Sequence, residues 1–103
     1  MKVIKKLSEL IEDELKMSEC YVDKALEYKE EYASLAKVLY GISLQEMEHV
    51  TALHKSVVEL IEDYRRDHGD PPADMRAVYD YLHKRHIDHA AEIKTKQNMY
   101  KEG

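Results

Sequence analysis

Apolar residues recur along the chain at spacings of three and four residues, which is the period of an α-helix. No stretch shows the sustained two-residue alternation rich in Val, Ile and Thr that is typical of strands. The pattern therefore predicts an all-α fold. It contains three helices, at residues 2–28, 33–67 and 73–101.

The sequence HGDPP at residues 68–72 is a strong helix break, because it combines a glycine with two prolines. As one helix, the segment before it would extend about 100 Å at the usual rise per residue, so it is expected to fold back on itself. We place the turn near residues 28–33, where the apolar stripe changes phase. Short connections make a helix antiparallel to the one before it. The predicted architecture is a long helical hairpin followed by a third helix.

Length and composition narrow the class of protein. The 103 residues suffice for a single domain, residues 1–103, and the net charge of -5 argues against a dedicated nucleic-acid binder. The apolar runs are too short to cross a bilayer, and acidic residues interrupt the N-terminal segment where a targeting signal would be apolar. The single cysteine, Cys20, allows no internal disulfide. We expect a cytoplasmic protein whose partners include neither nucleic acid nor membrane.

A carboxylate interrupts the apolar stripe predicted for the first helix. This stripe comprises Ile4, Leu7, Ile11, Glu14, Ser18, Tyr21, Ala25 and Tyr28. A second track on the same helix comprises Val3, Leu7, Leu10, Glu14, Met17 and Tyr21. Glu14 belongs to both, which predicts that it lies at the centre of the apolar face. A carboxylate buried there without a partner would cost several kcal/mol.

The apolar stripe predicted for the second helix also contains polar residues. It comprises Leu35, Leu39, Ile42, Glu46, His49, Leu53, Ser56, Leu60 and Tyr64. Glu46 and His49 are three residues apart and hence neighbours on one core-facing side of the helix. A turn near residue 30 puts Glu14 at the same depth. Two carboxylates and an imidazole suit a divalent first-row metal, with iron, manganese and zinc all compatible by ligand type. If the phase of the hairpin differs, the three residues instead form salt bridges on the helix surface.

These residues resemble one half of the metal centre in ferritin-like di-iron carboxylate proteins, of the rubrerythrin and bacterioferritin kind. That family places a Glu on one helix and Glu-x-x-His on the next. Glu14 matches the first, and EMEH at residues 46–49 supplies the second. The resemblance covers roughly residues 4–64. This chain lacks a second Glu-x-x-His motif and the CxxC pairs of a complete rubrerythrin.

The resemblance implies a half-bundle chain that pairs as a homodimer or higher homo-oligomer, as in short encapsulated ferritin-like proteins. The resulting four-helix bundle would bind two iron ions and oxidise ferrous iron with O₂ or peroxide, as a ferroxidase or a peroxide-consuming oxidoreductase. In those terms Glu14 is a terminal carboxylate, Glu46 bridges the metals and His49 is the nitrogen ligand.

The third helix offers further candidate ligands. Its predicted apolar side includes His86 and His89, and a turn near residue 70 puts His89 closest in depth to His49. Both could complete the site within one chain, or both could be boundary histidines that hydrogen-bond to tyrosines or carboxylates. His54 and His68 are expected on the surface.

Two other functions are compatible with the sequence. One is a metal-free helical dimerisation or interaction module in which polar core residues set the register. The other is a histidine-rich zinc or nickel binder centred on His83, His86 and His89.

Overall fold

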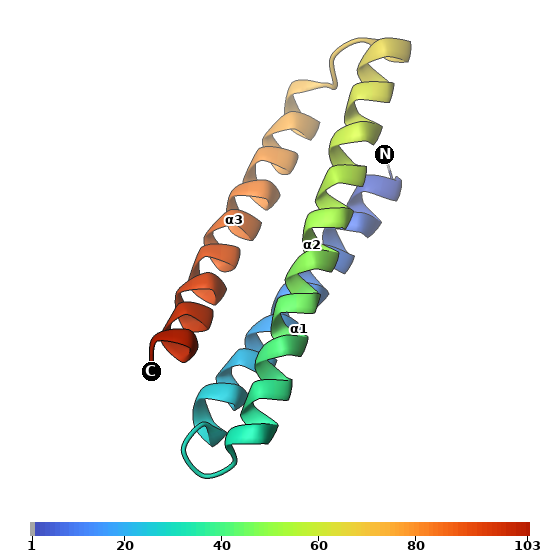
Figure 1. Ribbon diagram of the computed structural model, residues 1–103. Helices are drawn as coiled ribbons and strands as arrows, with labels where there is room; N and C mark the ends of the chain where they lie inside the picture. Colours follow the sequence, from blue (N-terminus) through green and yellow to red (C-terminus); the bar gives the residue numbers. More distant parts are fainter. Residues whose placement is uncertain (1) are drawn as a thin grey trace.

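The computed structural model describes residues 2–103, which form three long helices (Figure 1). Helix α1 spans Lys2–Tyr28, α2 spans Ala33–His68 and α3 spans Ala73–Glu102. Successive helices run antiparallel, and residues 2–103 contain no strand. The predicted all-α fold, a long hairpin followed by a third helix, is confirmed. The predicted helix ends differ from the observed ones by at most one residue.

The two connections differ in how they end a helix. Between α1 and α2 the chain turns within four residues, and the N–H of Tyr32 donates to the carbonyl of Tyr28 at 2.8 Å. After α2, Gly69 adopts a φ of 80°, a left-handed conformation that glycine takes without steric cost. Its N–H donates to the carbonyl of Arg65 at 2.9 Å. Pro71 and Pro72 then lead into α3, since neither can continue α2.

A regular set of buried residues holds α1 against α2. In α1 these are Ile4, Ser8, Ile11, Leu15, Ser18, Val22 and Ala25, and in α2 they are Ala36, Ser43 and Val50. The hydroxyl of Ser18 donates to the carbonyl of Ser43 at 2.9 Å, and the hydroxyl of Ser43 donates to the carbonyl of Ser18 at 2.7 Å. This reciprocal pair lies between the two buried helix faces and fixes their register.

Helix α3 packs mainly on α1 and only slightly on α2. Its fully buried Ile93 joins a cluster with Ile11, Leu15 and Val50. The three helices form a rod whose Cα atoms extend 56 × 19 × 18 Å. At the end that carries the α2–α3 connection, these two helices project beyond the start of α1 (Figure 1). None of the helices in residues 2–103 has both the length and the apolar character needed to cross a membrane.

The core face of α1 is rotated from the one that the sequence predicted. The prediction that Glu14 lies at the centre of this face is wrong, because Glu14 is half-buried at its edge and Leu15 is fully buried. Ser8 and Val22 are likewise buried in place of Leu7 and Tyr21. The physical reason is that α1 packs against two helices. Its buried face turns toward α3, which leaves the other edge partly exposed.

Candidate metal centre

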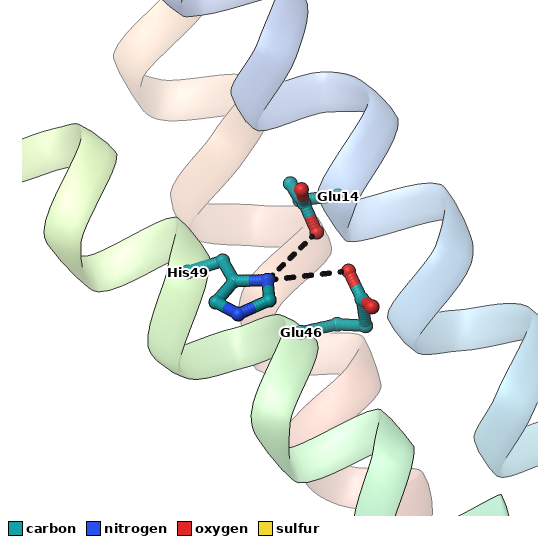
Figure 2. Close-up of side chains that lie close together, drawn as sticks. All are labelled: Glu14, Glu46 and His49. Carbon is teal, nitrogen blue, oxygen red and sulfur yellow. Dashed lines mark hydrogen bonds and ion pairs between the residues drawn. The ribbon is translucent and has the colours of Figure 1, made fainter.

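Glu14 of α1 converges with Glu46 and His49 of α2 (Figure 2). The Nδ1 atom of His49 lies 3.4 Å from Oε2 of Glu14 and 3.7 Å from Oε2 of Glu46. One ligand atom from each residue lies within 4.8 Å of the other two. Oxygen and nitrogen ligands at about 2.0–2.2 Å from tetrahedral zinc lie roughly 3.3–3.6 Å from one another. Small side-chain movements would therefore let all three hold one cation.

The register of the hairpin accounts for this convergence. Ser18 and Ser43 lie opposite each other, and Glu14 precedes Ser18 by one helical turn while Glu46 follows Ser43 by nearly one. Because the helices are antiparallel, both steps lead in the same direction along the rod. His49 follows Glu46 by a further three residues on the same side of α2. The predicted equal depth of Glu14 and Glu46 is what the structure shows.

The three side chains differ in exposure. The side chain of Glu46 is 13% exposed and that of Glu14 is 26% exposed, whereas that of His49 is 58% exposed. The prediction that His49 faces the core is therefore wrong. Val50 is the buried residue here, and His49 lies about 100° around the helix from it. The cluster is a half-buried site that opens to solvent through His49.

The cluster lies on the side of the hairpin away from α3. Glu12 approaches Arg85 of α3 at 3.6 Å, and Glu14 lies about 200° around α1 from Glu12. Figure 2 agrees, since the ribbon of α3 passes behind the hairpin while the three side chains lie in front.

His86 and His89 do not join this cluster, because α3 packs on the opposite edge of α1. The Nε2 atom of His89 lies 3.2 Å from Oε1 of Glu19. His86 lies beside Glu12 and Arg85 along a surface cleft. The alternative that both are boundary histidines fits His89, whose partner is a carboxylate. The three histidines of the alternative zinc or nickel site, His83, His86 and His89, do not meet at one point. His83 contacts His54, whereas His89 contacts Glu19.

His54 was missed as a functional candidate. It is half-buried rather than on the surface, and its ring stacks on that of His83 with centroids 4.8 Å apart. Burial lowers the pKa of His54, and the neighbouring His83 lowers it further. His54 follows the buried Val50 by four residues, a helical spacing that places both near the α2 core face. This spacing is the feature of the sequence that could have indicated the partial burial of His54.

By helical spacing, apolar side chains lie on the same faces of α1 and α2 as the carboxylate–histidine cluster. We call this surface the outer face of the hairpin. It comprises the exposed Val3, Leu10, Met17 and Leu35 and the half-buried Leu7, Tyr21, Ile42 and Leu60. On α1 these residues follow the second apolar track of the sequence. Exposed apolar residues that gather on one face mark an interaction site on many proteins.

Comparison of the chain with protein-family models, with curated proteins and with solved structures gave no match.

Proposed function

We propose that this chain binds divalent first-row metal ions, iron in particular, in a ferritin-like carboxylate–histidine site formed when two copies pack through their outer faces. The observation that carries the proposal is the convergence of Glu14, Glu46 and His49 within an apolar surface. Two nearby carboxylates without a cation repel each other, and a bound metal relieves that repulsion.

The ligand count supports pairing of two chains. One chain offers two carboxylates and one imidazole, which leaves coordination positions open on a first-row metal. A two-fold axis through the outer face would bring the same three residues from each copy together. The pair would then contain a Glu from each of two helices and Glu-x-x-His from each of the other two, which is the ligand set of ferritin-like di-iron bundles.

The apolar character of the outer face supports the same arrangement. The side chains of Val3, Leu10, Met17 and Leu35 are each roughly half exposed. Burying them against identical residues of a second copy is favourable by about 25 cal/mol per Å² of apolar surface. The closed contact would also shield His49 from solvent.

Within this proposal the residues have distinct roles. Glu46 is the most buried of the three residues and would bridge two metal ions. Glu14 and His49 would each bind a single ion at the edge of the site. A pair of ferrous ions supplies two electrons, enough to reduce O₂ to peroxide or peroxide to water with uptake of two protons. A reducing compartment such as the cytoplasm would keep both the iron ferrous and the exposed Cys20 a thiol.

Anaerobic titration with ferrous iron tests the proposal. We expect about one iron per chain, and we expect Glu46→Ala to weaken binding at least tenfold because it removes the bridging carboxylate. Glu48→Ala is the matched control, since Glu48 is an exposed carboxylate two residues away that does not belong to the cluster. Equal iron binding by both variants, or no binding by the unmodified chain, would refute the proposal.

The exposed apolar surface also fits a metal-free interaction module. Treatment with a chelator separates the two functions. A metal protein should lose melting temperature when the ion is removed, because a ligand that binds only the folded state stabilises it. A metal-free module should melt at the same temperature before and after treatment.

A further inference from the structure

A second group of imidazoles lies between α2 and α3, away from the carboxylate cluster. The Nε2 atom of His54 is 3.2 Å from the Nδ1 atom of His83. His86 follows His83 by three residues on α3 and lines the same cleft, which has a volume of about 240 Å³. The lining also includes Asp80, one turn before His83.

The separation of the two nitrogen atoms suits coordination of one metal ion. Two imidazoles bound to tetrahedral zinc at about 2.0–2.1 Å place their nitrogen atoms about 3.3 Å apart. His54 and His83 already lie at this spacing, although they belong to different helices. The spacing therefore suits two adjacent ligands of a single ion, although the stacked rings would have to rotate for both lone pairs to point at it.

The surroundings favour imidazoles that can bind a metal. Burial lowers the pKa of both His54 and His86, which favours the neutral form of each imidazole, the form that binds metals. Ile4, Ile11 and Val57 line the same cleft and make that part of it apolar. Neutral imidazole binds zinc, copper and nickel, whereas the carboxylate-rich cluster on the outer face suits harder ions.

We propose that His54 and His83 form a second metal site, which takes a borderline divalent cation such as Zn²⁺ and has His86 available as a third ligand. The site differs from the carboxylate cluster in both position and chemistry. It would join α2 to α3, the two helices that contact each other least. The ion would act as a structural cross-link between α2 and α3, beside the N-terminal half of α1, whose Ile4 and Ile11 line the same cleft.

Titration with Zn²⁺ alone tests this site in a full-length variant that lacks the carboxylate ligands, Glu14→Ala/Glu46→Ala. This background makes the result independent of the proposed iron site. We expect one Zn²⁺ per chain at pH 7.5, measured by calorimetry, together with a rise in melting temperature. Adding His54→Gln and His83→Gln should weaken binding at least tenfold and remove that rise.

His68→Gln in the same background is the matched control, because His68 is an exposed α2 histidine outside the cleft. It should bind Zn²⁺ as the background does. Circular dichroism of each variant without metal establishes that its helices are intact. The proposal is overturned if the background binds no Zn²⁺, or if the His54→Gln/His83→Gln variant binds it with undiminished affinity.

Discussion

Ser18, Ser43 and Gln97 form a buried polar layer between the three helices. Besides the reciprocal serine bonds, the side-chain amide of Gln97 donates to the hydroxyl of Ser43 at 3.0 Å. All three helices therefore meet at one hydroxyl group. A buried polar layer whose members are all hydrogen-bonded favours one register over its neighbours, since a slip would leave each group without a partner.

Ser43→Ala tests this layer. The variant removes the hydroxyl that Gln97 and Ser18 both contact and leaves the Gln97 amide buried without its acceptor. We expect a loss of about 1–3 kcal/mol in the free energy of unfolding, measured in urea. Ser56→Ala is the control, because Ser56 is exposed, and it should change stability by less than about 0.5 kcal/mol. Equal effects of the two substitutions would contradict the assigned role of the layer.

For the carboxylate–histidine cluster, the sequence predicts which residues lie side by side but not how exposed each of them is. Glu14 and Glu46 could be paired because a hairpin turn fixes which residues lie at equal depth. The exposure of His49 could not be predicted, since a stripe of alternating three- and four-residue steps fits two adjacent helix faces equally well. The choice between these faces depends on where α3 packs.

Helix α3 is attached by one apolar anchor and a set of ion pairs. Ile93 is fully buried against α1 and α2, whereas most other residues of α3 are exposed. Lys96 lies 3.2 Å from Glu19 and 2.9 Å from Asp23. Such partly exposed ion pairs contribute little individually, so we expect the burial of Ile93 to contribute more than any one of them.

Ile93→Ala should therefore cost about 2–4 kcal/mol in the free energy of unfolding, because it opens a cavity among Ile11, Leu15 and Val50. Hydrogen exchange should show greater loss of protection in α3 than in α1. Ile87→Ala alters an exposed isoleucine of the same helix and should change stability by less than about 0.5 kcal/mol. A similar loss from both variants would show that Ile93 is no special anchor.

The docking of α3 should also weaken in acid. Burial alone would raise the pKa of Glu19, but the hydrogen bonds and charges of Lys96 and His89 outweigh it and hold that pKa below its usual value. The folded-state pKa is thus lower than the unfolded one. The stabilisation is complete above the unfolded pKa of about 4.3 and is lost as the pH falls through the folded value.

Glu19→Gln should flatten this dependence. Thermal melts of the original chain should show a decline in melting temperature below about pH 4.5 that is steeper than in the variant. Glu48→Gln, which changes an exposed carboxylate on α2, should leave the slope as it is in the original chain. A Glu19→Gln variant with an unchanged slope would mean that Glu19 contributes nothing to the acid sensitivity.

For the whole molecule, the sequence predicts the three helices and their antiparallel order but not the side on which α3 packs. The HGDPP connection permits either side of the hairpin, because its length only requires that α3 begin near the end of α2. The side on which α3 packs determines which side chains of the three helices meet. It places His89 beside Glu19, brings His83 to His54, and leaves the carboxylate cluster on the free outer face.

That free face leads to a prediction about assembly. If the outer face joins two copies, Leu10→Lys should place two like charges in the contact, which costs more than the loss of apolar area alone. We expect the unmodified chain to sediment as a dimer and the variant as a monomer. The variant should also lose most of its iron binding, although Glu14, Glu46 and His49 are unchanged.

Ile87→Lys introduces the same charge on α3, away from the outer face, and should remain dimeric with normal iron binding. Full iron binding by a monomeric Leu10→Lys chain would show that a single hairpin is sufficient for the metal.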